Sequence, residues 1–148
     1  MKIYLDTSVI SALFDERNPE RKSLTEEFFS EIEIYTTYIS ELTIAEIDRT
    51  PDPLLRRKMK ETIRNFTTLE ITESTEELAT EYVKYGAIPE SYFEDAYHIA
   101  VSVLNEMDYL LSWNYRHIVR RKTKDIVRMV NSLRNLKQVE IITPGELL

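Results

Sequence analysis

The sequence predicts an α/β fold, in which helices cover both faces of a central parallel sheet of about five strands. Short runs of β-branched and aromatic residues alternate along the chain with longer segments whose apolar residues recur every three or four positions. These are the patterns of strands and of amphipathic helices. Strands that alternate with helices form parallel sheets. The chain has 148 residues and no internal repeat or linker, so we expect one domain spanning residues 1–148.

The predicted elements begin with the first residues of the chain. Residues 2–5 are apolar or strand-forming and contain no glycine or proline, so a buried strand is expected there. Further strands are predicted at residues 33–39, 67–71, 109–111 and 139–142. Helices are predicted at residues 9–14, 20–31, 41–49, 54–65, 74–85 and 89–106 and in the later part of 115–136. Gly86 is expected to end the fifth of these helices, and Pro144 begins a last helical turn.

The composition limits the classes of protein and of metal site. Hydrophobic residues make up 43% and charged residues 30%, which is usual for a globular protein in water. There is no cysteine and there are only two histidines, so any metal would be held mainly by oxygen, which favours Mg²⁺ or Mn²⁺ over zinc. No apolar run approaches ~18 residues, and no signal-peptide pattern precedes the first strand. We therefore expect a cytoplasmic protein with no contact to a membrane.

The charge is distributed unevenly. The net charge of −7 by itself argues against nucleic-acid binding. Residues 1–95, however, carry 21 acidic and 11 basic side chains, whereas residues 96–148 carry 5 acidic and 8 basic ones. Six basic residues fall between Arg116 and Arg128, which is either a solvated helix face or a rim that contacts phosphates. The candidate nucleic-acid contacts in this segment are Arg116, His117, Arg120, Arg121 and Lys124.

Four polar side chains fall at comparable places in the predicted architecture. Asp6 directly follows the first strand and Asn114 follows the fourth, while Glu46 and Asp95 lie on helices. The carboxyl ends of parallel strands meet at one edge of the sheet, where open α/β sheets bind their ligands. Three carboxylates near one another repel, and a divalent cation relieves that repulsion. An alternative stays open: Asp6 or Ser8 caps the next helix, and Glu46 reaches water from a helix boundary.

Four sequence blocks around these residues occur in the order found in a known family and span nearly the whole chain. They are Leu5-Asp6-Thr7-Ser8-Val9-Ile10, Ser40-Glu41-Leu42-Thr43-Ile44-Ala45-Glu46, Asp95-Ala96-Tyr97-His98-Ile99-Ala100 and Tyr109-Leu110-Leu111-Ser112-Trp113-Asn114-Tyr115-Arg116-His117-Ile118. Together they resemble the PIN-domain nucleases, the fold of VapC-type toxins. The resemblance implies a PIN-like three-layer α/β/α fold.

The resemblance also implies an activity and a set of site residues. The activity is Mg²⁺- or Mn²⁺-dependent endoribonuclease cleavage of RNA phosphodiester bonds by a metal-activated water. The family's acidic positions correspond to Asp6, Glu46 and Asp95, which would bind the metal, and its fourth position, commonly Asp, corresponds to Asn114. The residues expected to line the site are Thr7, Ser8 and Ser112. The implied partners are an RNA substrate, a small antitoxin protein and a second copy of the chain in a homodimer.

Other classes of function compete with this one. Asn114 is neutral and leaves less negative charge for a second cation, which favours a catalytically weak or inactive PIN-fold module that binds nucleic acid or protein. A branch of the family nevertheless shares the same Trp-Asn-x-x-His-Ile ending. Haloacid-dehalogenase-like phosphatases need a second Asp where this chain has Ser8, and response-regulator receivers need paired acids where Asp6 stands alone.

The two histidines and the tryptophan in these blocks are expected to have structural roles. His98 and His117 are expected to form hydrogen bonds rather than to bind metal, because oxygen ligands already dominate the site. Trp113 is expected to pack in the core at the end of a strand, with stacking on a base as the alternative.

Overall fold

The computed structural model describes all 148 residues and confirms the predicted α/β fold. The strands are β1 (Lys2–Leu5), β2 (Thr36–Ser40), β3 (Thr67–Leu69), β4 (Tyr109–Leu111) and β5 (Glu140–Ile142). The α-helices are α1 (Thr7–Ala12), α2 (Pro19–Ser30), α3 (Glu41–Asp48), α4 (Pro53–Ile63), α5 (Glu73–Lys84), α6 (Phe93–Leu104) and α7 (Arg121–Leu133). Three 3₁₀ turns complete the chain: η1 (Ile32–Ile34), η2 (Glu90–Tyr92) and η3 (Pro144–Leu147).

All five strands are parallel and lie in the order β3-β2-β1-β4-β5, so the first strand is the central one. In the register, Leu5 of β1 is paired with Leu111 of β4, and Ser40 of β2 is paired with Leu69 of β3. Asp6, the residue after Leu5, donates its backbone N–H to the carbonyl of Leu111 at 3.2 Å. The carboxyl ends of the two central strands therefore meet where Asp6 and Ser112 begin the next segments.

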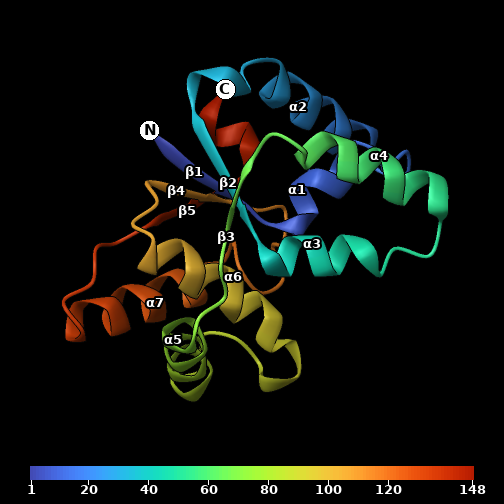
Figure 1. Ribbon diagram of the computed structural model, residues 1–148. Helices are drawn as coiled ribbons and strands as arrows, with labels where there is room; N and C mark the ends of the chain where they lie inside the picture. The colour runs from blue at the N-terminus through green and yellow to red at the C-terminus, as the bar shows by residue number, and fades with distance from the viewer.

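Helices cover both faces of the sheet (Figure 1), and an apolar cluster lies between the sheet and the helices on each face. Side chains alternate along a strand, so Tyr4 packs with α5, α6 and α7, whereas Ile3 and Leu5 pack with α1, α2, α3 and α4. The same division separates Leu110 from Leu111 in β4. This is the three-layer α/β/α arrangement. No helix has the length and apolar character needed to cross a membrane.

Several element boundaries differ from the predicted ones for local reasons. The strand predicted at residues 33–39 is a 3₁₀ turn at Ile32–Ile34 followed by β2, so the β-branched and aromatic composition extended the prediction too far toward the amino terminus. The helix predicted at residues 89–106 is divided into η2 and α6. Residues 115–120, which precede Arg121 in the basic segment, form a turn. Arg120 has an extended backbone and is the N-cap of α7.

Candidate functional site

Asp6 is held in a cradle of hydroxyl groups at the carboxyl end of the central strand. Its side chain is only 3% exposed. Ser8 Oγ donates to Asp6 Oδ1 and Ser112 Oγ donates to Asp6 Oδ2, each at 2.5 Å. The two hydroxyls in turn accept backbone N–H groups: Ser8 from Trp113 and Ser112 from Asn114, each at 2.9 Å. The chain after β4 thus fixes the orientation of the Asp6 carboxylate through two serines.

The capping alternative for Asp6 is not what the structure shows. Asp6 occupies the N-cap position of α1 with an extended backbone, but its side chain accepts no backbone N–H of the helix. Both carboxylate oxygens are directed to the hydroxyls of Ser8 and Ser112 instead. The Asp6 carboxylate is therefore held by the two serine hydroxyls at the edge of the sheet and does not cap α1 through its side chain.

Glu46, on α3, belongs to a buried hydrogen-bond chain that begins at the central strand. The Glu46 Oε1 atom accepts from Thr7 Oγ1 and contacts His98 Nε2, both at 2.6 Å. His98 Nδ1 lies 2.6 Å from the hydroxyl of Tyr4, which lies 2.8 Å from Ser40 Oγ. Tyr4, His98 and Ser40 are buried. The chain therefore fixes the Glu46 carboxylate from behind and leaves its second oxygen, Oε2, without a protein donor.

Asp95, on the first turn of α6, is held by the turn that follows β4. Its Oδ2 atom accepts from Asn114 Nδ2 at 3.2 Å and contacts His117 Nδ1 at 3.1 Å. Asn114 Oδ1 accepts the backbone N–H of His117 at 2.9 Å, so one amide side chain closes its own turn and also binds Asp95. As with Glu46, both contacts use one oxygen, and Asp95 Oδ1 accepts no hydrogen bond.

Burial and the charge of His98 together decide the protonation of the three carboxyls. Burial raises the pKa of Asp6 and of Asp95, while the charge of His98 opposes the rise in both. Burial would also raise the pKa of Glu46, but the hydrogen bond and charge of His98 and the hydroxyl of Thr7 lower it to about 2. Burial alone would lower the pKa of His98, and its contacts with Tyr4 and Glu46 raise it well above the ordinary value. The raised pKa of His98 favours its protonated form between Glu46 and Asp6.

The donor set has the chemistry that a hard divalent cation requires. No group of three His, Cys, Asp or Glu side chains in the structure is close enough to hold a metal by itself. Mg²⁺, however, is usually held by one or two carboxylates and keeps several waters. Glu46 Oε2 and Asp95 Oδ1 are oxygens that no protein donor occupies, and Asp6 keeps the second lone pair of each oxygen. The residues therefore fit a hydrated Mg²⁺ or Mn²⁺ ion.

The family of the chain follows from its sequence as well as from this fold. A model of the PIN domain family matches residues 3–122, which is most of the chain. The chain belongs to the PIN domain family. The matched segment contains Asp6, Glu46, Asp95 and Asn114, and the parallel sheet agrees with the predicted PIN-like fold. No curated protein matches the chain in sequence.

Solved structures of similar fold include two VapBC complexes and one VapC protein. The VapBC-1 structure from nontypeable Haemophilus influenzae has a TM-score of 0.59 at 14% identity, covering 97% of this chain and 98% of that one. VapBC2 from Rickettsia felis, bound to a DNA fragment from its promoter, has a TM-score of 0.57 at 9% identity, covering 95% and 97%. Mycobacterium tuberculosis VapC20, a toxin that cleaves the sarcin-ricin loop, has a TM-score of 0.56 at 20% identity, covering 76% and 89%. These likenesses establish the PIN fold.

The structure brings the predicted site residues to one edge of the sheet. Thr7, Ser8 and Ser112 all donate to carboxylates, as described above. Asp6, Glu46 and Asp95 all lie within electrostatic reach of the single side chain of His98. The sequence predicted hydrogen bonding for His98, but it gave no sign of the partner Tyr4, which is 94 positions away in the chain and buried in the central strand.

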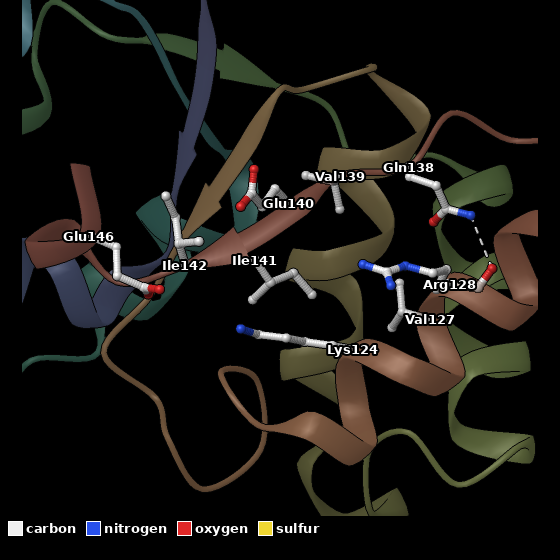
Figure 2. A pocket seen from close by; sticks show the side chains of 9 residues that line it. All are labelled: Lys124, Val127, Arg128, Gln138, Val139, Glu140, Ile141, Ile142 and Glu146. Carbon is white, nitrogen blue, oxygen red and sulfur yellow. Dashed lines mark hydrogen bonds between the residues drawn. The ribbon is translucent and has the colours of Figure 1, made fainter.

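The basic segment divides between internal structure and free surface. Arg120 is engaged inside the protein, because its guanidinium donates to the carbonyl of Ala87 at 2.9 Å and to Thr123 Oγ1 at 2.7 Å. Arg121 is exposed. Lys124 and Arg128 line a pocket of about 160 Å³ between α7 and β5, which also contains the carboxylates of Glu140 and Glu146 (Figure 2).

Trp113 packs in the core, as expected. It is buried, and its indole Nε1 donates to Thr25 Oγ1 of α2 at 2.9 Å. Its neighbour Tyr115 is exposed instead.

Proposed function

We propose that this chain is a Mg²⁺- or Mn²⁺-dependent endoribonuclease that hydrolyses RNA phosphodiester bonds and acts as the toxin of a toxin–antitoxin pair. The observation that carries the proposal is the set of three carboxylates, from β1, α3 and α6, oriented at one edge of the sheet by separate hydrogen-bond networks. Membership of the PIN family supports the nuclease class. The proposed substrate is cellular RNA, so we place the activity in the cytoplasm.

Each residue of the site has a proposed task. Glu46 and Asp95 would hold the cation through the oxygens that accept no hydrogen bond, and Asp6 through the remaining lone pairs of the two oxygens that accept from Ser8 and Ser112. A bound divalent cation would supply the activation of water and the neutralisation of the leaving oxygen that phosphodiester hydrolysis requires. Ser8 and Ser112 keep the Asp6 carboxylate in place, and His98 keeps Glu46 in place. Asn114 orients Asp95 through its side-chain amide. We propose that Asn114 contributes to catalysis only by orienting Asp95.

The experiment is cleavage of a mixed-sequence single-stranded RNA with and without Mn²⁺. The wild-type chain is expected to cleave only with the metal, and Asp6→Asn should abolish that cleavage. Asp125→Asn, at an exposed position of α7, is the matched control and should cleave as the wild type does. Cleavage that persists in the chelator EDTA, or in Asp6→Asn, would contradict the proposed mechanism.

A second candidate is a PIN-fold module that binds nucleic acid or protein with weak or no catalysis. Two observations favour it: Asn114 adds no charge to the site, and His98 compensates one of the three carboxylates. A ligand that binds only the folded state raises the melting temperature. A module without a metal site should therefore show no shift in melting temperature with Mn²⁺, whereas the proposed enzyme should melt higher.

Two partner proposals accompany the proposed activity. Two of the similar structures are VapBC complexes, which supports a small antitoxin as a partner of this chain. Co-expression with the neighbouring reading frame, followed by co-purification, tests that proposal. The homodimer stays a prediction, and the mass of the purified chain from light scattering tests it.

A further inference from the structure

Two exposed tyrosine rings lie on either side of the candidate site in the chain. Four aromatic side chains of the protein are exposed: Tyr85, Tyr92, Phe93 and Tyr115. Tyr115 directly follows Asn114 and is 54% exposed, and Tyr92 closes η2 just before the helix that carries Asp95 and is 42% exposed. Asn114 contacts Asp95, so both rings are tied to the same part of the site.

Each tyrosine is paired with an arginine and with a second ring. The Arg116 guanidinium lies 5.5 Å from the centroid of the Tyr92 ring, and that ring lies 4.1 Å from the His117 ring. The Arg21 guanidinium lies 5.8 Å from the centroid of Tyr115 and 5.2 Å from that of Trp113. Residues 113–117 therefore contribute to two separate arginine–aromatic groups around one turn.

Neither arginine forms a salt bridge, although Arg21 lies close enough to Asp15 to help lower the pKa of that carboxyl. Arg21 and Arg116 take part in no salt bridge and in no side-chain hydrogen bond in the structure, unlike Arg49, which forms a two-armed pair with Glu94. An arginine stacked on a ring without a carboxylate keeps its N–H groups available for a phosphate. The guanidinium groups of Arg21 and Arg116 are therefore both without a salt-bridge partner, and Arg116 follows Asn114 by two positions.

The group around Tyr115 also borders a hollow. A pocket of about 240 Å³ is lined by Arg21, Leu24, Trp113 and Tyr115, together with the N-cap residue Asn18 and the acidic Glu20 of α2. It offers aromatic side chains and one cation beside one carboxylate. Base–aromatic stacking tolerates any sequence, since every base has a π face.

We propose that Tyr115 and Tyr92 stack two unpaired bases of single-stranded RNA, one on each side of the phosphate presented to the carboxylates. Arg21 and Arg116 would contact the neighbouring phosphates. The inference rests on the proposed function and specifies its substrate, because only unpaired nucleotides can present their faces to side chains. A duplex keeps its bases stacked on one another and is not expected to use these rings.

The test measures binding without cleavage. The probe is a short mixed-sequence 2′-O-methyl oligonucleotide that carries 2-aminopurine, and the buffer contains EDTA. Fluorescence anisotropy measures the affinity, and quenching of the 2-aminopurine fluorescence measures stacking. Tyr115→Ala and Tyr92→Ala should each weaken binding by roughly tenfold or more, the usual loss for one stacked base. Tyr115→Phe and Tyr92→Phe keep the ring and should bind as the wild type does. Tyr85→Ala, at a ring that is 43% exposed on the far end of α5, should change nothing.

A structural readout accompanies the affinities. Trp113 is the only tryptophan of the chain and its ring centroid lies 6.4 Å from that of Tyr115. Oligonucleotide binding should change its fluorescence in the wild type and in Tyr115→Phe, but not in Tyr115→Ala. The same sequence as a duplex should bind with an affinity that the two alanine substitutions leave unaltered.

Three results would overturn the inference. The first is unchanged oligonucleotide affinity in both alanine variants, and the second is an equal loss for the single strand and the duplex. The third is a change in oligomeric mass in these variants with oligonucleotide binding intact, which would assign the rings to a protein contact. The test needs neither metal nor cleavage. A chain that cleaves no RNA but binds the oligonucleotide through these rings would refute the nuclease and leave the stacking site standing.

Discussion

The substitution Asn114→Asp tests the role of the Asn114 amide, which stands where the family commonly has Asp. Its cost in folding stability can be worked out from the contacts of Asn114. The Asn114 amide donates to Asp95 at 3.2 Å, so the substitution replaces a donor with a second carboxylate against the first. Two like charges 4 Å apart repel by about 4 kcal/mol at an effective dielectric constant of 20. The pair can escape by binding a proton, which for a carboxyl of ordinary pKa costs about 4 kcal/mol at pH 7 and about 1.5 kcal/mol at pH 5.

The repulsion energy and the cost of protonation set the expected size and pH dependence of the loss of stability in Asn114→Asp. Without metal at pH 7, Asn114→Asp should lower the free energy of unfolding by about 2–4 kcal/mol, which is roughly 5–15 °C in melting temperature for a chain of this length. The folded-state pKa of the new carboxyl pair is raised, so the destabilisation is present at high pH and shrinks as the pH falls. At pH 5 the loss should be at most about 1.5 kcal/mol.

The assay is urea unfolding of the wild type and the variant in EDTA at both pH values, followed by thermal melting with Mn²⁺. Hard divalent ions prefer anionic oxygen, so Mn²⁺ should raise the melting temperature of the variant more than that of the wild type. Asn65→Asp adds the same charge at an exposed position after α4, where the backbone is not left-handed, and serves as the control. Equal stability of Asn114→Asp and the wild type at both pH values would refute the Asn114–Asp95 contact. A smaller Mn²⁺ effect in the variant would place position 114 outside the metal site.

Further predictions follow from the other contacts of the site. Asp6→Asn, which removes a buried charge but keeps the shape, should leave the metal-free protein equally or more stable by thermal melting while abolishing cleavage. The pKa of Glu46 is about 2 in the folded protein against an ordinary value of 4.5, so the free energy of unfolding should fall as the pH drops from about 4.5 toward 2. Glu46→Gln should flatten the pH dependence of urea unfolding over that range. Arg120→Gln should cost about 1 kcal/mol in urea unfolding, because it removes the guanidinium contacts with Ala87 and Thr123 while Thr123 Oγ1 still donates to the Ala87 carbonyl. Arg121→Gln should leave stability unchanged and flatten the salt dependence of RNA binding; an unchanged slope would make this basic segment ordinary surface.

The fold and the positions of the carboxylates were accessible from the sequence because each depends on local pattern. The run Ile3-Tyr4-Leu5 before Asp6 is sufficient to predict a buried strand that ends on a carboxylate. Alternation of strands and helices then predicts a parallel sheet, whose strand ends bring Asp6 and Asn114 together. The boundary near residue 33 was missed, since apolar composition does not separate a 3₁₀ turn from the start of a strand.

The hydrogen-bond networks were not accessible, because they join residues far apart in the chain. Tyr4 looks like an ordinary strand residue, and only the packing of α6 on β1 shows that its hydroxyl reaches His98. The choice between capping and chemistry for Asp6 also depended on Ser112, which is 106 positions away. Likewise, the charge pattern from Arg116 to Arg128 could not distinguish the engaged Arg120 from the exposed Arg121.

Asparagine at position 114 satisfies two requirements that aspartate cannot meet together. The turn after β4 needs an acceptor for the backbone N–H of His117, which either side chain supplies through Oδ1. Asp95 needs a donor, which only the amide supplies. With aspartate at 114, the turn would form against the repulsion of two carboxylates, at the cost in stability worked out above. With asparagine, the turn closes and Asp95 accepts a hydrogen bond without that repulsion. The amide therefore lets the metal-free chain orient Asp95 at no electrostatic cost.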